Sequence, residues 1–380
     1  MPTYLKNAKI LSEKGNAFCI EEHDILIRNH KIAAFDVFEH GTEIIDLKGK
    51  LLIPQFFNIH SHLGESLYSI EGNCWNIGKY LDYTSGITNS KTDSENEKIW
   101  SESADKSIKL MQEAACCGFC AARSALKAKA ADMLSMSGYP LMLSDKLKKF
   151  YVSGIDGFLK HCSLFRTAEC SAGVFLHSVY KSNQELLKLA GECMQNNAEF
   201  ISVHISEDAE TRQMEERLFK KEPVFVLNEC GLLRDASILV HGSLLSEQEL
   251  NLVAAKKAAI AICPVSSRFL NSHTANPHKL NKKGIKWCIG SDGLATGRTF
   301  SLIEQIKVFK KEFPEISNVQ LLKSVTQVPA SLFKRAVYTG LVETGVKASF
   351  ITINFDNSGD MEQSLGNFLL GNTEYDTLSL

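Results

Sequence analysis

Alternating apolar and polar residues occupy both ends of the chain in short runs. The first fifty residues contain ILIRN, KIAAFDVF and TEIIDLKGKLLI, separated by turn formers such as Gly15 and Asn29. The last forty residues return to this pattern in GLVETGVKASFITINF. Alternation with a period of two is typical of half-buried strands. We therefore expect residues 1–53 and 341–380 to pack together as one small β-sandwich.

Between these ends, short apolar runs alternate with longer segments of helical periodicity. FISVHISE precedes a polar helical segment, and ASILVHG precedes SEQELNLVAAKKA. Such units, repeated along residues 54–340, favour parallel strands that close into a barrel. The predicted fold class is α/β: a (β/α)8 TIM barrel over residues 54–340 with the β-sandwich beside it. The most polar stretch, residues 85–98, is expected to be a solvated loop that leads into a helix.

The charge balance limits the classes of binding partner that the sequence favours. Lys+Arg 42 against Asp+Glu 44 gives a formal net charge of −2, so no global field favours nucleic acid or an anionic membrane. The amino-terminal residues lack a signal-peptide pattern, and no run approaches the roughly 18 apolar residues of a membrane span. We expect a cytoplasmic protein that acts on a small molecule, with no nucleic-acid and no membrane partner.

Cysteine usage does not indicate a disulfide framework. The 11 cysteines are scattered through apolar segments, which favours reduced thiols. Cys116, Cys117 and Cys120 resemble half of a structural zinc cluster, but no second pair lies at the spacing that such a site requires. Small buried side chains on a strand are the favoured interpretation.

Two histidines follow an apolar run in LLIPQFFNIHSHLGES. His60 and His62 are two residues apart at the end of the predicted strand, so both imidazoles project from the same face. Two imidazoles directed at one point suit a metal ion. The pair alone fits hydrogen-bonded histidines equally well, so both interpretations stay open at this stage.

Four more polar residues follow the ends of later predicted strands. His204 ends one strand and Glu207 lies three residues further on, His241 ends another strand, and Asp292 follows a third. The C-terminal ends of barrel strands form one face, so these residues should converge with the histidine pair on a single cavity. Taken singly, His241 also fits a core histidine and Asp292 a turn residue.

Three neutral imidazoles and one carboxylate from this set suit Zn²⁺, Fe²⁺ or Mn²⁺ and leave room for a water molecule. An open coordination position indicates catalysis rather than a structural role. Such a metal lowers the pKa of its bound water from 15.7 to about 7 and so provides hydroxide at neutral pH. The pattern therefore predicts a metal-dependent hydrolase.

A series of segments carries a family resemblance: DLKGKLLIPQFFNIHSH, GVFLHSVYKSNQELL, VHISE, LVHG, AICPVSSRFL, IGSDGL and GLVETGVKASFITI. Spread nearly end to end, they resemble the amidohydrolase superfamily. The similar branch contains the cytosine, guanine, adenosine-type and S-adenosylhomocysteine deaminases and the triazine hydrolases. The resemblance implies a barrel flanked by a β-sandwich built from both termini, as the hydrophobic pattern also predicts.

The resemblance also implies roles for single residues. It assigns metal binding to His60, His62, His204 and Asp292, and catalysis to Glu207, His241 and Asp292. Glu207 would shuttle protons, and His241 would orient the hydroxide and the leaving group. Binuclear members carry a carboxylated lysine after the fourth strand, where this chain has His177. One divalent metal is therefore expected, with zinc favoured and iron as the alternative.

The substrate contacts are less defined. The position of His177 usually faces the substrate in the family, although a histidine bonded to a neighbouring loop also fits. Further candidates lie in predicted barrel loops or strand ends, where a packing aromatic or a solvated arginine fits each of them as well. These candidates are Trp75, Tyr80, Arg123, Arg268 and Arg298.

Three functions fit this site. The favoured one is deamination of an aminated heterocycle such as a purine, pteridine, pyrimidine or nucleoside, in which metal-bound hydroxide attacks the amino-bearing ring carbon and Glu207 transfers protons. The alternatives are hydrolysis of a cyclic amide or a triazine, and a non-catalytic metal-binding scaffold. Glu207 in the pattern H-x-x-E favours deamination within this branch. Related barrels are often homodimers, so a homodimer stays open.

Overall fold

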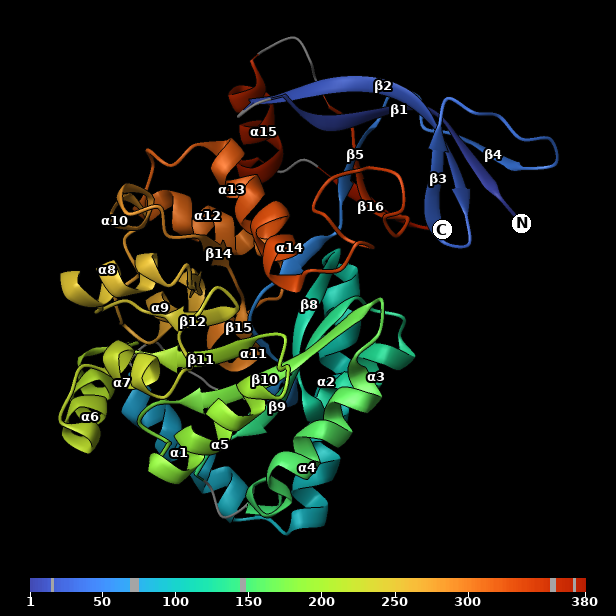
Figure 1. Ribbon diagram of the computed structural model, residues 1–380. Coiled ribbons are helices and arrows are strands. Elements are labelled where there is room, and N and C mark those ends of the chain that lie inside the picture. Colours follow the sequence, from blue (N-terminus) through green and yellow to red (C-terminus); the bar gives the residue numbers. More distant parts are fainter. Residues whose placement is uncertain (15–16, 69–74, 144–147, 356–359, 372–373) are drawn as a thin grey trace.

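The computed structural model describes residues 1–14, 17–68, 75–143, 148–355, 360–371 and 374–380. Eight parallel strands form a nearly closed barrel with helices between them, which confirms the predicted (β/α)8 fold (Figure 1). The barrel strands are β6 (Phe56–Asn58), β8 (Cys116–Ala121), β9 (Ser135–Leu141), β10 (Cys170–Ser178), β11 (Ile201–Ile205), β12 (Ser237–His241), β13 (Ala259–Ile262) and β14 (Trp287–Ile289).

The gap between the first and last barrel strands is bridged where the chain continues past them. There β7 (Ser61–His62) pairs in parallel with β15 (Asp292–Gly293). Next to this pair, the amide of Asn58 donates to Ser291 Oγ at 2.6 Å, and the Ser291 N–H donates to Asn58 Oδ1 at 3.0 Å. Both residues are buried, so each supplies a partner for polar atoms that would otherwise be costly to bury.

Helices surround the barrel strands (Figure 1). They are the short η1 (Leu63–Glu65), α1 (Ile77–Asn89), α2 (Asp93–Glu113), α3 (Ala122–Ala130), α4 (Lys148–Phe165), α5 (Gln184–Gln195), α6 (Ala209–Phe219), α7 (Pro223–Glu229), α8 (Glu247–Ala255), α9 (Pro264–Phe269), α10 (Pro277–Lys282), α11 (Leu294–Gly297), α12 (Leu302–Glu312), α13 (Asn318–Val325), α14 (Gln327–Phe333) and α15 (Met361–Leu370).

The loop expected over residues 85–98 is mostly helical, so that prediction was wrong. Helix α1 continues to Asn89, and α2 starts at Asp93. Thr92 caps α2 with a capping box, because its hydroxyl accepts from the Glu95 N–H while the Glu95 carboxylate accepts from the Thr92 N–H. Such a box starts a helix within a fully polar segment, where hydrophobic periodicity gives no signal.

Both ends of the chain join one seven-stranded sheet. Its strands are β1 (Thr3–Lys14), β2 (Ala17–Arg28), β3 (Lys31–Phe35), β4 (Glu43–Asp46), β5 (Leu51–Pro54), β16 (Ser349–Ile353) and β17 (Tyr375–Ser379). The central contact is antiparallel, with Phe350 opposite Pro54 and Ile353 opposite Leu51. The N and C termini accordingly lie at the same end of the molecule (Figure 1).

This terminal sheet has a buried cluster of its own beside the main core. The cluster contains Leu5 and Ile25 from the amino-terminal strands together with Val346 and Phe350 from the carboxyl-terminal segment. Burial of apolar surface from both ends stabilises the pairing of segments that are distant in sequence. The exact division into a composite domain of residues 1–53 and 341–380 and a barrel of residues 54–340 stays a prediction.

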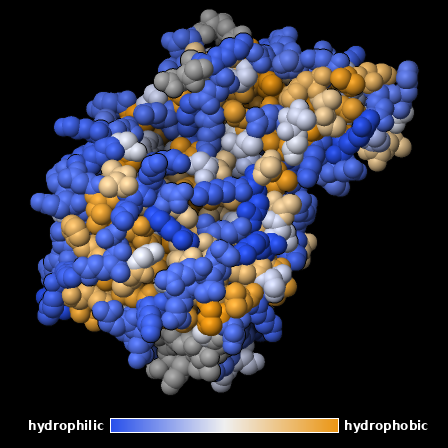
Figure 2. All heavy atoms as spheres, viewed as in Figure 1, coloured by the Kyte–Doolittle hydropathy of each residue, from blue (hydrophilic) through white to orange (hydrophobic). Residues whose placement is uncertain are grey.

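The surface is mainly hydrophilic in the view of Figure 2, with hydrophobic residues gathered where the terminal sheet projects from the barrel. Val37, Phe38 and Ile44 are about half exposed in this part of the chain. Cys116, Cys117 and Cys120 are free and buried within β8. Among the described helices, none is both long enough and apolar enough to span a bilayer.

A buried histidine on α4 makes the stability of the fold depend on pH. The Nε2–H of His161 donates to the carbonyl oxygen of Ser137 at 3.0 Å, and burial lowers the pKa of this imidazole from 6.5 to about 4. The unfolded chain therefore binds a proton at a higher pH than the folded chain does. The resulting contribution to stability is present above pH 6.5 and is lost as the pH falls towards 4.

We expect the free energy of unfolding to fall by about 3 kcal/mol more in the wild type than in His161→Gln between pH 7 and pH 4. Glutamine keeps a donor for Ser137 but does not titrate, so the other acid-sensitive groups cancel in the comparison. Urea titrations at several pH values measure the difference. Parallel pH profiles for the two proteins would contradict the assignment.

Candidate active site

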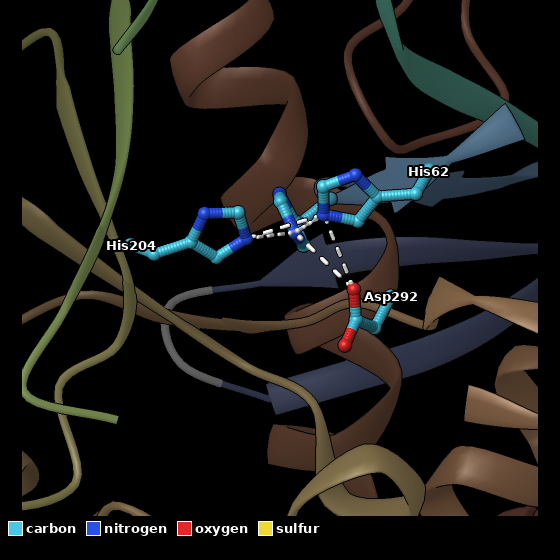
Figure 3. Close-up of side chains that lie close together, drawn as sticks. His62, His204 and Asp292 are labelled. Carbon is cyan, nitrogen blue, oxygen red and sulfur yellow. Dashed lines mark hydrogen bonds and ion pairs between the residues drawn. The ribbon is translucent and has the colours of Figure 1, made fainter. Parts of the chain in front are cut away.

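Four side chains from distant parts of the chain meet at the C-terminal end of the barrel. His60 follows β6, His62 lies in β7, His204 lies in β11 and Asp292 starts β15. One nitrogen or oxygen atom from each lies within 4.8 Å of the others. Figure 3 shows His62, His204 and Asp292 directed towards one another. The structure thus brings together the four residues that the sequence groups as metal ligands.

The three imidazoles meet through their Nε2 atoms. These atoms are 3.2 Å apart between His60 and His62, 3.2 Å between His62 and His204, and 3.1 Å between His204 and His60. A tetrahedral zinc ion with bonds of about 2.0 to 2.1 Å holds its nitrogen ligands about 3.3 to 3.4 Å apart. The triangle is therefore close to the size that a metal ion requires.

Hydrogen bonding fixes the tautomer of His204. Its Nδ1 lies 2.5 Å from the carbonyl oxygen of His177, which can only accept, so Nδ1 carries the proton and Nε2 presents a lone pair. Burial lowers the pKa of both His60 and His204, which keeps these rings neutral. Neutral rings with free Nε2 atoms are the form in which histidine binds metals.

The carboxylate of Asp292 is divided between two functions. Its Oδ1 lies 3.7 Å from His60 Nε2 and 3.3 Å from His62 Nε2. Its Oδ2 accepts hydrogen bonds from the hydroxyls of Ser266 at 2.5 Å and Thr296 at 2.9 Å. Burial alone would raise the pKa of Asp292, but the nearby His60, His62 and His241 hold it well below its usual range.

A glycine brings one of these hydroxyls into place. A Cβ atom on Gly297 would lie 1.8 Å from the carbonyl oxygen of Ser291, so only glycine allows α11 to pack this closely on the strand end. That close packing is what presents Thr296, the preceding residue, to Asp292. Hydrogen bonds of this kind orient ligands and tune the metals they hold.

Glu207 and His241 form a second pair beside the four convergent residues. His241 Nε2 lies 3.4 Å from Glu207 Oε1, and both side chains are almost fully buried. Burial and the charge of Asp292 raise the pKa of Glu207 well above its usual value, while burial lowers the pKa of His241 to about 4. A carboxyl whose pKa is raised in this way releases its proton less readily, which suits general acid and base chemistry.

Side chains of α6 hold the loop that carries Glu207 in place. Ser206 has a left-handed backbone with φ 45°, a conformation that is uncommon for residues with a side chain. Glu215 on α6 accepts from the Ser206 N–H at 3.1 and 3.3 Å and from its hydroxyl at 3.1 Å. Arg212 also donates to the Ser206 hydroxyl at 3.2 Å and pairs with Glu249 at 2.5 Å. These contacts fix the backbone between His204 and Glu207.

Glu207, His241 and three of the four convergent residues line a cavity of about 440 Å³. This volume is within the range of small-molecule sites. The walls combine the polar groups of the centre with residues from η1, α1, β10 and the segment after β10, including Glu65, Phe175, Tyr180 and Lys181. The Tyr80 hydroxyl donates to Glu65 Oε2 at 2.6 Å in this wall. The cavity therefore offers both aromatic and charged surface.

The structure places some of the predicted substrate contacts in the cavity wall and others elsewhere. His177 and Tyr80 line the cavity. Trp75 packs edge-on against Tyr83 at 5.4 Å and is absent from the cavity lining in the described part of the chain. The side chain of Arg123 lies outside the described residues. Arg298 stacks over Phe269 at 4.1 Å, which fits the alternative of a packing arginine.

Several site residues were not anticipated. Glu65 and Lys181 in the cavity wall, Ser266 and Thr296 behind Asp292, and Glu215 behind Ser206 are evident only in three dimensions. Glu65 had one signal in the sequence, because it lies three residues after His62 on the segment that enters the site. The others belong to helices or loops whose contacts no local pattern specifies.

Comparison with known proteins gives consistent matches. The profile described as "Amidohydrolase family" matches residues 51–374. A 5-methylthioadenosine/S-adenosylhomocysteine deaminase of Thermococcus sibiricus is 24% identical over 390 residues, which cover 94% of this chain and 86% of that protein.

Solved structures share the fold. Guanine deaminase of E. coli aligns with a TM-score of 0.82 and 17% identity over 100% of this chain and 97% of that chain. Atrazine chlorohydrolase of Arthrobacter aurescens, complexed with zinc, aligns with a TM-score of 0.82 and 16% identity over 98% and 91%.

Proposed function

This chain belongs to the amidohydrolase family, and from that premise we propose that it is a metal-dependent deaminase of an aminated heterocycle. The observation that carries the proposal is the juxtaposition of two groups in one cavity: the cluster of His60, His62, His204 and Asp292, and the acid Glu207. The first suits a metal ion, and the second suits proton transfer to a ring nitrogen. The matched deaminases of purine compounds support the same reaction class.

The chemistry of the donor set fits a divalent cation. Three nitrogen atoms with lone pairs, 3.1 to 3.2 Å apart, cannot all satisfy one another through hydrogen bonds. His60 enters the cluster through Nε2, and its Nδ1 is buried without a hydrogen-bond partner in the described part of the chain. We propose zinc, with iron as the alternative, held by His60, His62, His204 and Asp292. When bound, such an ion lowers the pKa of a water molecule to about 7.

The residues of this chain would then manage the protons. Glu207 in its protonated form gives a proton to the ring nitrogen next to the amino-bearing carbon, which makes that carbon electrophilic. It takes a proton from the attacking water as the new C–O bond forms and delivers that proton to the amino group. The C–N bond then breaks and ammonia leaves, while the remaining hydroxyl proton returns to Glu207 and the carbon is left with a C=O bond. His241, 3.4 Å from Glu207, positions the water and the leaving amine.

Hydrolysis of a triazine is the second candidate, favoured by the structural similarity to the zinc-containing chlorohydrolase. That reaction needs the same metal but releases chloride. Within the proposal, the substrate is a small heterocycle. A homodimer and a cytoplasmic location stay predictions.

The first expected result concerns metal content. We expect about one zinc or iron ion per chain after purification, and His62→Ala should lose most of it because one of four ligands is gone. His273→Ala, an exposed residue away from the cavity, should keep it. Elemental analysis after dialysis measures both, and a chelator should lower the melting temperature of the wild type and of His273→Ala but not that of His62→Ala. Two tightly held ions, or full retention by His62→Ala, would contradict the assignment.

The second expected result concerns Glu207. A panel of aminated purines, pteridines, pyrimidines and nucleosides should include a compound from which the enzyme releases ammonia. Glu207→Gln keeps the shape but removes the proton transfer, so kcat should fall on the order of 10² to 10⁴ while metal content stays unchanged. Glu210→Gln, exposed at the start of the same helix α6, should match the wild type. Near-normal turnover by Glu207→Gln, or release of chloride from an added chlorotriazine without ammonia from any panel compound, would favour the second candidate.

The third expected result concerns Glu215, which positions Glu207 through Ser206. Glu215→Ala should lower kcat on the order of 10- to 100-fold with little change in KM, because displacement of the loop affects proton transfer more than binding. Glu215→Gln should recover part of this loss, since its amide oxygen can still accept from the Ser206 N–H. Glu216→Gln is the matched control, because Glu216 pairs with the same Arg212 at 2.6 Å but does not contact Ser206. Equal losses in the glutamine and alanine variants would argue against positioning.

A further inference from the structure

A lysine in the wall of the active-site cavity has no assigned role. Lys181 follows β10, four residues after His177, and lines the same cavity as His62, His204 and Glu207. Its backbone is fixed at both ends: its N–H donates to Ser178 Oγ at 3.2 Å, and its carbonyl oxygen accepts from the Leu143 N–H at 2.9 Å. The segment after β10 thus holds a cationic side chain at a defined place in the wall.

The ammonium group of Lys181 lacks a partner among the residues that the structure describes. In the described residues, no carboxylate forms an ion pair with its Nζ atom, and no acceptor forms a hydrogen bond with it. Glu65 lines the same cavity and favours the charged lysine electrostatically, but its Oε2 already accepts from the Tyr80 hydroxyl. Burial lowers the pKa of Lys181, which reflects the cost of an ammonium that is shielded from water.

Most other polar groups of the active site have partners within the protein. The rings of His60, His62 and His204 face one another, Asp292 is held by two hydroxyls, and Glu207 lies beside His241. An unpaired cation in a partly dry cavity is costly unless a ligand supplies the countercharge. Its location, in the wall and outside the reacting cluster, is suited to a substituent of the substrate rather than to the ring that reacts.

We infer that Lys181 binds an anionic oxygen on a substituent of the substrate. The substrate class is then an aminated heterocycle that carries a carboxylate or a phosphate, oriented with its amino-bearing carbon at the cluster and its anion at Lys181. The ring identity and the deamination rest on the proposed function, whereas the anion preference rests on the cavity wall. A charge-assisted hydrogen bond to an ammonium is among the stronger contacts a ligand can make.

Direct binding tests the inference separately from catalysis. Two matched series are titrated by calorimetry into the metal-loaded full-length protein: adenosine, adenosine 5′-carboxylic acid and adenosine 5′-monophosphate, and pterin with pterin-6-carboxylate. In at least one series, an anionic compound should bind about tenfold or more tightly than its neutral parent. Comparison of the 5′-carboxylic acid with the monophosphate distinguishes a carboxylate from a phosphate as the preferred group.

Variants assign the preference to one residue. Lys181→Met keeps the apolar stem and should abolish the anion preference while binding of the neutral parent persists. Lys181→Arg keeps the charge and should retain part of the preference. Lys188→Met, an exposed lysine on α5, should behave as the wild type.

The two hypotheses fail in different ways. Equal binding of anionic and neutral compounds, or a preference that survives in Lys181→Met, overturns the role of Lys181 even if ammonia is released. A preference that depends on Lys181, without ammonia release from any compound of the wider panel, supports that role and overturns the deaminase proposal. Lys181→Met should raise KM for an anionic substrate with little change in kcat, because the contact lies away from the reacting atoms.

Discussion

The parallel pairing of β7 with β15 is the constraint on which the rest of the site depends. It joins the start of the barrel to its end and places Asp292 opposite Ser61. In the sequence, Ser61 lies between two of the convergent histidines. The same seam is tied by backbone bonds, since the N–H groups of Ser291 and Asp292 both donate to the carbonyl oxygen of His60. Closure of the barrel and assembly of the cluster are therefore one event. A barrel that failed to close here would leave three imidazoles without their carboxylate.

Holding such a cluster is energetically costly, and the surrounding structure offsets the cost. Ser206, His241 and Asp292 all have positive φ angles, and all lie at strand ends that face the cavity. Residues with side chains occupy this region only when neighbouring contacts determine the conformation. Glu215 supplies those contacts for Ser206, and paired strands supply them for Asp292. Strained backbone and buried polar groups thus occur together where the chemistry is proposed.

The sequence predicts the parts of the molecule that repeat or obey a period. Alternating strands at both ends and strand and helix units between them predict the barrel. Polar residues after the strands predict one site with His60, His62, His204, Glu207, His241 and Asp292, and the family resemblance selects four of them as candidate ligands. The residues that hold these side chains in place could not be predicted. Ser266 and Glu215 act through hydrogen bonds between different elements, and no local sequence pattern specifies which residues form such bonds. The loop prediction for residues 85–98 was wrong because polar capping residues, rather than a period of apolar residues, define the helices there.

The residues that line the cavity fall into two groups, which the barrel constrains to different degrees. The cluster and Glu207 come from strand ends of the barrel, whose spacing the closed sheet keeps nearly constant. Other parts of the wall include η1, α1 and the segment after β10, which the sheet does not constrain in this way. Substitutions in that wall change what the cavity accepts and leave the reacting atoms in place. Under the proposed function, the strand ends determine the reaction type, and the wall that holds Glu65 and Lys181 determines the choice of substrate.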